Sequence, residues 1–164
     1  MEQNQLERLG EQEDTQLGRY LTFPVGEETF AIAIRCISEI IGMYPITRLP
    51  DVPKHVKGII NLRGKIVPVI DIRLKFKKPA VAYDERTCII VLETGGLAAG
   101  LIVDSVSEVL SIPDEEIVAP PEYGATAQNH YICGIGSAEG KVKLILDVDK
   151  LLDEEEAAAS ASVL

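Results

Sequence analysis

The sequence predicts a mostly β fold made of two related small barrels, and three observations carry this prediction. Short runs of alternating apolar residues recur along the chain, a pattern typical of half-buried strands. Long helical periodicity is absent from the 164 residues. The two halves of the chain also resemble each other, and closing each half into a barrel would remove exposed strand edges.

Two hairpins and two further strands are predicted from local pattern. Residues 19–34 alternate on both sides of a Gly-Glu-Glu turn, and residues 88–103 do so on both sides of a Gly-Gly turn, so each segment indicates a pair of antiparallel strands. Two apolar runs indicate single strands, and two segments have short helical periodicity. The strands are expected at 64–72 and 140–148, and the short helices at 34–41 and 146–156.

An internal duplication relates the two halves. With an offset of 69, residues 20–41 align with 89–110, and with an offset of 76, residues 55–76 align with 131–152. Apolar positions match along both alignments. In the second, Gly64 meets Gly140, but Arg63 meets Glu139. The turn glycine is therefore predicted to be architectural, whereas the arginine belongs to one half only.

Composition indicates one folded domain with acidic ends. We expect a flexible acidic segment over 1–16, a single domain over 17–152 and a disordered tail over 153–164. The barrels are placed at about 17–83 and 84–152, with exchange of a strand or helix between them left open. The first half carries eleven bases and five acids, and the second carries four bases and twelve acids. This polarity favours head-to-tail contacts, which build rings or strings of molecules.

Several classes of protein are disfavoured by the same sequence. No apolar run reaches the roughly 20 residues of a membrane span, and the N-terminus is acidic where a signal peptide is basic, so we expect a cytoplasmic protein without direct membrane insertion. Three scattered cysteines indicate reduced thiols, and the cysteines and two histidines lack metal-ligand spacing. No catalytic residue, metal site or cofactor is predicted.

Motifs that resemble catalytic sites fit structural roles better. Residues 134–141 end in Gly-Lys but lack the first glycine and the Ser or Thr of a phosphate-binding loop, so a hairpin turn is favoured. Cys133 and His130 would point to opposite faces of a strand. Asp71 and Asp147 precede short helical stretches and are expected to cap them. A small β-barrel RNA-binding protein stays an alternative, although aromatic residues make up only 5% of the chain.

Segments across residues 19–152 resemble the CheW family of bacterial chemotaxis coupling proteins. They include the Ile-Ser-Glu-Ile-Ile run at 37–41, the Asn-Leu-Arg-Gly block at 61–64 with its Pro-Val-Ile-Asp strand, and Val-Asp-Ser-Val-Ser-Glu-Val-Leu at 103–110. The resemblance implies two SH3-like five-stranded barrels with short helices and a groove between them. It also implies a non-enzymatic adaptor that couples methyl-accepting chemoreceptors to the histidine kinase CheA in signalling arrays. A CheW-type scaffold of a non-flagellar receptor-kinase pathway is the close alternative.

The resemblance further implies which partners and residues make contact. The partners would be the CheA regulatory domain and the cytoplasmic tip of the receptors, with no nucleic acid, and the protein would be a monomer alone and part of rings with its partners. Tyr123 is expected at a kinase or ring contact. Whether Arg63 meets a receptor carboxylate or ties the two lobes together stays open. The positions that match the family's receptor-binding groove are Ile37, Glu39, Arg63, Gly64, Cys88, Val106 and Val109.

Overall fold

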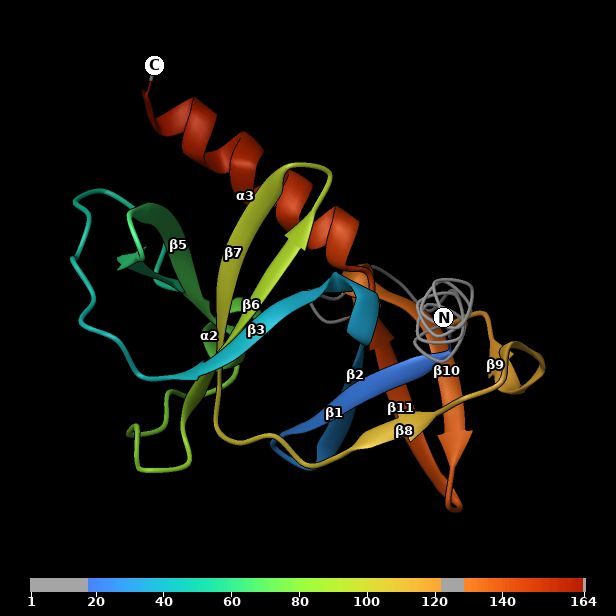
Figure 1. The fold of residues 1–164 in the computed structure, drawn as a ribbon. Helices are drawn as coiled ribbons and strands as arrows, with labels where there is room; N and C mark the ends of the chain where they lie inside the picture. The colour runs from blue at the N-terminus through green and yellow to red at the C-terminus, as the bar shows by residue number, and fades with distance from the viewer. Residues whose placement is uncertain (1–17, 122–128, 164) are drawn as a thin grey trace, which may run out of the picture.

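The computed structural model describes residues 18–121 and 129–163, with side chains as far as residue 156, and contains two curled sheets side by side (Figure 1). The mostly β prediction is confirmed. Sheet A has the spatial order β8 (Val109–Ser111), β1 (Arg19–Val25), β2 (Glu28–Ala33), β11 (Lys141–Leu146), β10 (Ile132–Ala138) and β9 (Ile117–Val118). Sheet B has the order β3 (Ile37–Gly42), β6 (Cys88–Thr94), β7 (Leu97–Val103), β5 (Lys65–Asp71) and β4 (Val56–Leu62).

Each sheet takes strands from both halves of the chain. Strands β1 and β2 join β8 to β11 in sheet A, whereas β6 and β7 join β3 to β5 in sheet B. Each exchanged pair of strands is held on one side by a parallel neighbour, β11 beside β2 and β5 beside β7. On the other side it is held by an antiparallel neighbour, β8 beside β1 and β3 beside β6. The sheets therefore do not coincide with the sequence halves 17–83 and 84–152: each half gives its first two strands to the sheet that is completed by the other half.

The duplication is visible in the strand order and in the hydrogen bonds. Under the two sequence offsets, β8, β1, β2, β11 and β10 of sheet A correspond to β3, β6, β7, β5 and β4 of sheet B. The corresponding strands follow the same spatial order in both sheets, and sheet A has β9 as a sixth strand. The amide of Asp71 donates to the carbonyl of His55, and the amide of Asp147 donates to that of Tyr131, both at 2.8 Å. These two bonds join residues that correspond under the offset of 76, so the repeat is a backbone property as well as a sequence pattern.

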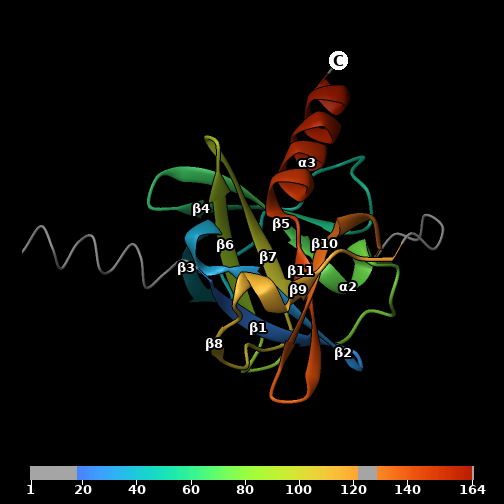
Figure 2. The ribbon, with the colours of Figure 1, turned by 90° about the vertical axis from the view of Figure 1, so that its right-hand side faces the viewer.

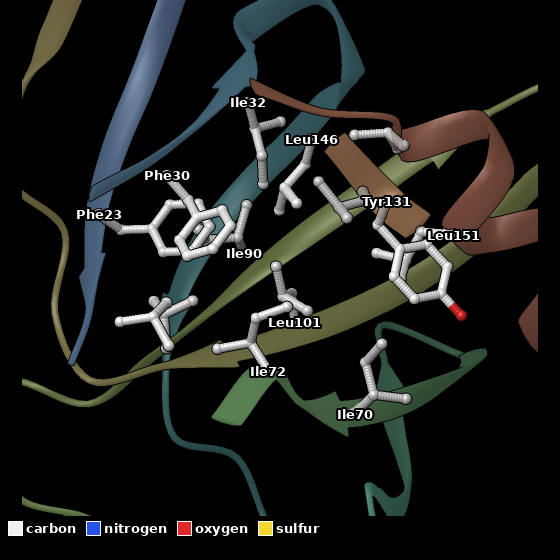
Figure 3. Close-up of a cluster of buried hydrophobic side chains, with 14 of the residues drawn as sticks. Phe23, Phe30, Ile32, Ile70, Ile72, Ile90, Leu101, Tyr131, Leu146 and Leu151 are labelled. Atoms are coloured by element: carbon white, nitrogen blue, oxygen red, sulfur yellow. The ribbon is translucent and has the colours of Figure 1, made fainter. Parts of the chain in front are cut away.

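One apolar core joins the two sheets. Phe23, Phe30 and Ile32 from sheet A pack with Ile90 and Leu101 from sheet B in the same cluster (Figure 3). All five side chains are fully buried, and each contributes about 2 kcal/mol of hydrophobic stabilisation. A second, smaller cluster lies within sheet B and includes Ile60, Val67 and Ile89. Because the larger cluster spans both sheets, neither barrel has a complete core of its own.

The local predictions for turns and helix caps are confirmed. The two expected hairpins form as β1–β2 and β6–β7, and residues 134–141 lie in the β10–β11 hairpin rather than in a phosphate-binding loop. The Asp71 carboxylate accepts a 2.9 Å bond from the Arg73 amide at the start of α2 (Ile72–Lys75). The Asp147 carboxylate accepts from the Lys150 amide at 3.0 Å, at the start of α3 (Val148–Val163).

One local prediction is wrong. The short helix expected at 34–41 is only the 3₁₀ turn η1 (Ile34–Cys36), and β3 follows it. Pairing of β3 with β6 satisfies the backbone there, so long-range hydrogen bonds outweigh a weak local pattern. At the C-terminal end, where a short helix over 146–156 was predicted, α3 spans Val148–Val163 and extends away from the sheets (Figures 1 and 2).

Buried and charged contacts explain why α3 forms. Val148, Leu151 and Leu152 are buried in the main core. On the next turn, the nearly buried Glu155 carboxylate contacts Lys75 Nζ at 2.6 Å and His55 Nε2 at 3.0 Å. Glu154 contacts the 3₁₀ turn η3 (Asn129–Tyr131), where it accepts a hydrogen bond from the Tyr131 hydroxyl and pairs with His130. In the described part of the chain, no helix combines the length and the apolar character needed to span a membrane.

Candidate functional site

The Asn-Leu-Arg-Gly block lies at the tip of the β4–β5 hairpin. Its last two residues, Arg63 and Gly64, form the two-residue turn between the strands. Arg63 and Gly64 have φ values of 51° and 88°, which is the positive-φ geometry of a type I′ turn that matches the twist of the flanking strands. The Asn61 side-chain oxygen accepts a 2.8 Å bond from the Gly64 amide. An arginine in the left-handed region is uncommon, and here the turn holds its side chain outward, with 67% of it exposed.

Arg63 forms an ion pair with Glu39 within sheet B. One terminal guanidinium nitrogen donates to one carboxylate oxygen of Glu39 on β3. Strands β3 and β4 are the two edges of sheet B, so this pair bridges the edges at one end of the curled sheet. The partner of Arg63 therefore lies in the same barrel, and the pair is not a tie between the two lobes.

The Glu39 carboxylate keeps one unused acceptor. Its Oε1 atom is buried and has no hydrogen-bond partner, whereas Oε2 binds Arg63. A buried acceptor without a donor costs stability, and such an exception is often associated with a functional group. Arg63 uses one of its five N–H donors on Glu39, so the pair presents free donors to the outside, while the unused Oε1 acceptor of Glu39 is enclosed by the protein.

Two other predicted contact residues, Ile37 and Cys88, lie at opposite ends of the β3–β6 pair. Ile37 pairs with Leu92, and Cys88 pairs with Gly42. Both Ile37 and Cys88 are half-buried and pack against the main core. Burial raises the pKa of the Cys88 thiol. These two side chains therefore help to position the ends of β3, and only part of each faces outward.

Val109 begins β8, an edge strand of sheet A, and Val106 lies in the segment just before it. Their exposed fractions are 38% and 49%, so an outward contact fits them better than a role in the core. Backbone hydrogen bonds from Thr22 to Glu108 and from Ser107 to Thr22 fix this segment on β1. Among the described residues, no hydrogen bond or ion pair joins either valine to the Glu39–Arg63 pair.

Ile40 and Met43 are exposed apolar residues in and just after β3 that were not predicted as contact residues. They are 44% and 37% exposed, and Ile40 lies next to Glu39 on β3. Period-2 alternation along β3 was the signal that could have identified Ile40, because Ile37, Glu39 and Ile41 are half-buried while Ser38 and Ile40 are exposed. The wrong helical prediction at 34–41 concealed that alternation.

The structure gives no support to a nucleophilic or metal-binding reading of the described residues. The His130 ring is paired with Glu154, and burial raises the pKa of the Cys133 thiol, which lowers the thiolate fraction at neutral pH. Within 18–121 and 129–163, no three His, Cys, Asp or Glu side chains come together as metal ligands. Tyr123, the expected kinase or ring contact, lies outside the described residues.

The charge polarity persists after the strand exchange. Residues 34–104, which contain all of sheet B, carry eleven bases and seven acids. The rest of the body, residues 17–33 and 105–152, carries four bases and ten acids. Sheet B is therefore the basic end of the molecule and sheet A the acidic end, an arrangement that favours oriented contacts between molecules.

Comparisons with known proteins point to one family. Residues 19–156 match the family model described as CheW-like domain. The chain is 42% identical over 139 residues to the chemotaxis protein CheW of Klebsiella aerogenes, covering 85% of this chain and 84% of that protein. The relative from Rhizobium meliloti is 32% identical over 140 residues, with coverages of 85% and 90%. The crystal structure of the scaffolding protein TtCheW from Thermoanaerobacter tengcongensis superimposes with a TM-score of 0.74 at 34% identity, covering 79% of this chain and 88% of that one.

Proposed function

Because this chain belongs to the CheW family of non-enzymatic chemotaxis scaffold proteins, we propose that it couples the cytoplasmic tip of chemoreceptors to the histidine kinase CheA. The observation that carries this proposal is the Glu39–Arg63 pair at an edge of sheet B, whose arginine side chain is 67% exposed. Such a surface binds another protein and performs no chemistry of its own. The adaptor acts by position, because holding both partners raises the concentration of each near the other.

The receptor contact is proposed at the Glu39–Arg63 end of sheet B. Receptor tips are helical, and a helix would place apolar residues against exposed side chains such as Ile40 and a polar residue against Arg63. Arg63 has free N–H donors for a receptor carboxylate while it keeps Glu39. The exposed Val106 and Val109 are proposed to extend this contact onto β8.

The cellular setting follows from the same proposal. The protein would act in the cytoplasm, at membrane-associated receptor arrays that it reaches through its partners. It would be a monomer alone and would enter rings through head-to-tail contacts between acidic and basic barrels. The opposite charges of sheets A and B support this orientation.

The test is a titration of isotopically labelled protein with the two partners. We expect chemical-shift changes on binding the CheA regulatory domain, and a separate set around Arg63 on binding a receptor cytoplasmic fragment. In the Arg63→Glu variant the receptor affinity is expected to fall at least about tenfold, while the affinity for CheA is unchanged. The absence of shift changes with CheA at near-millimolar concentration would contradict the proposed function.

A further inference from the structure

A mainly apolar cavity opens beside α3, where the parallel strands β5 and β7 of sheet B begin. It has a volume of about 330 Å³, at the lower end of the range of roughly 300–1,000 Å³ for small-molecule pockets. Leu152 lies in the main core, and Val56 and Leu97 pack against that core, so the cavity is a part of the core surface that the described residues leave open. Its apolar lining includes Leu49, Val56, Ile66, Pro68, Leu97 and Leu152.

The repeat shows that this apolar lining is specific to one copy. Sheet A has a groove at the equivalent place, lined by residues 27–29 with Lys141, Val142 and Leu144. Under the two sequence offsets, each of these residues corresponds to one that lines the cavity beside sheet B. Glu28, however, stands in the place of Leu97, and none of the described residues that line the groove belongs to a helix. The fold therefore supplies a groove in both copies, whereas an apolar lining and a helical wall occur only in sheet B.

The cavity also contains a hydrogen-bond acceptor that has no donor. The Glu155 side chain is 9% exposed and lines the cavity. Its Oε1 atom lies 2.6 Å from Lys75 Nζ and 3.0 Å from His55 Nε2, but within the described part of the chain no donor reaches its Oε2 atom. Among the described residues, Glu39 Oε1 is the one fully enclosed side-chain atom without a partner. Glu155 Oε2 is therefore not sealed off, and the cavity that its side chain lines is the opening next to it.

We propose that this cavity binds a small, mostly apolar molecule with an uncharged N–H donor, and that this N–H hydrogen-bonds to Glu155 Oε2. The inference does not depend on the proposed function. Glu155 and the exposed Glu156 in the lining disfavour an anion, and the lysine of the lining, Lys65, is already paired with Glu93. Lys75 balances the charge of Glu155, so a neutral donor is sufficient.

The acceptor is ionised at neutral pH. Burial opposes the charged form, but hydrogen bonds from His55 and Lys75 outweigh it and lower the pKa of the Glu155 carboxyl. An N–H bond to a charged acceptor is among the stronger hydrogen bonds in proteins. The apolar lining contributes by removing the rings of the ligand from water.

The test uses N-phenyl-1-naphthylamine, an apolar molecule with one N–H whose fluorescence rises in apolar surroundings. The full-length protein should bind it saturably at one site, with a Kd below about 200 µM, and its melting temperature should rise in the presence of the probe. Ala98→Phe places a large side chain in the cavity and should raise the Kd at least about tenfold. Thr29→Phe makes a matched change in the equivalent groove of sheet A and should change the Kd less than about twofold.

Glu155→Gln tests the hydrogen bond separately. Lys75 can only donate, so it fixes the amide oxygen of the glutamine on its own side and leaves the NH₂ group where Oε2 was. The Kd of N-phenyl-1-naphthylamine should then rise at least about tenfold. The Kd of 1-phenylnaphthalene, which has the same rings without the N–H, is measured by displacement of the first probe and should change less than about twofold.

Thermal melts establish that each variant is folded, and Ile66→Asp, at the 57% exposed residue of the lining, replaces Ala98→Phe if that variant does not melt cooperatively. The absence of saturable binding to wild type overturns the inference, as does an equal loss in Ala98→Phe and Thr29→Phe. A Kd that depends on protein concentration would indicate a site between two copies and would overturn it too. Equal effects of Glu155→Gln on both probes would overturn the assignment of the N–H donor.

Discussion

Sheets A and B are two copies of one design, and their differences lie in side-chain charge. Both copies keep the hairpin glycine and the aspartate that caps the following helix. In both, the backbone amide of that aspartate also donates a hydrogen bond to the carbonyl of the residue just before the first strand of the hairpin. At the hairpin tip, however, one copy has Arg63 and the other has Glu139. Features that both copies share are therefore architectural, and features that only one copy has are the candidates for function.

A second pair of equivalent positions also differs in charge between the copies, and here the acidic and basic residues are interchanged. Arg73 on α2 pairs with Asp104 after β7, at 2.5 Å and 2.6 Å from two guanidinium nitrogens. The equivalent positions in the other copy are Asp149 on α3 and Arg35 on η1. The basic and acidic residues have exchanged places between the copies, so charge varies in this fold while backbone geometry is retained.

The largest effect is expected from a glycine that both copies share. A Cβ on Gly58, whose φ is 143°, would lie 2.1 Å from the Thr47 carbonyl oxygen, whereas one on the equivalent Gly134 would lie 2.8 Å from a methyl group of Ile117. Gly58→Ala should lower the free energy of unfolding by about 3–4 kcal/mol and Gly134→Ala by about 1–2, because a side chain yields more easily than backbone. Urea denaturation measures both.

Gly42→Ala is the matched control for these glycines. Its Cβ would have no atom within 4 Å, and it also lies on a strand of sheet B. We expect a change below about 0.5 kcal/mol. If all three substitutions had equal cost, close approach of the backbone would not explain the shared glycines.

The Arg73–Asp104 pair should matter less than Gly58. The two side chains are 18% and 33% exposed, so Arg73→Gln should cost about 1–2 kcal/mol after allowance for solvent screening. A double-mutant cycle with Asp104→Asn isolates the pair energy. A coupling energy near zero in that cycle would mean that the Arg73–Asp104 contact does not stabilise the fold. The interchanged charges at Arg35 and Asp149 would then give no evidence of a conserved structural role.

The α3 contacts have no counterpart on the shorter α2 and predict acid sensitivity. His55 and Lys75 pair with Glu155 and hold the pKa of its carboxyl below the usual value despite burial. A lowered folded pKa gives stability that is complete above about pH 4.5 and is lost as the pH falls through the folded pKa. Glu155→Gln should reduce the free energy of unfolding by about 1–2 kcal/mol at pH 7.

The measurement is urea denaturation of wild type and Glu155→Gln at pH 7, 5 and 3. The two curves of stability against pH should converge at the acid end, since the wild-type carboxylate is then protonated and its contribution is gone. Parallel curves across this range would show that the Glu155 charge does not stabilise α3.

The smallest stability effect is expected at the residue proposed to matter most for binding. Arg63 is 67% exposed, and solvent screening leaves exposed ion pairs with little effect on stability. Arg63→Glu gives the tip of the β4–β5 hairpin the same residue that the equivalent β10–β11 hairpin has at Glu139, and the fold already accommodates a glutamate in that turn. Its melting temperature should therefore fall by only about 2–4 °C. A larger drop would make the Glu39 pair a structural lock on sheet B instead of a binding surface.

Local sequence pattern was enough to predict some of these elements and not others. The hairpins, the turn at Arg63-Gly64 and the capping aspartates depend on residues a few positions apart, and they were predicted. The exchange of strands depends on the parallel pairing of β2 with β11, whose residues are more than 100 positions apart. No local period encodes that contact.

The site was predictable to a similar degree. Arg63 was recognised as specific to one repeat, but its partner depends on how β3 and the β4–β5 hairpin approach across the curled sheet. The helix that contains Glu154 and Glu155 was predicted, but their cationic and hydroxyl partners were not, because these partners lie far from them in the sequence. Long-range electrostatics decided both cases.

The exchange of strands has a consequence for the nascent chain. The first two strands to leave the ribosome, β1 and β2, receive their neighbours β8 and β11 only after residues 109–146 have been synthesised. Until then β2 presents an open edge to other chains, and pairings of such high sequence separation form slowly. A break between residues 83 and 84 would leave two fragments that each lack strands of both sheets, yet together contain every strand, so they should regain structure only when mixed.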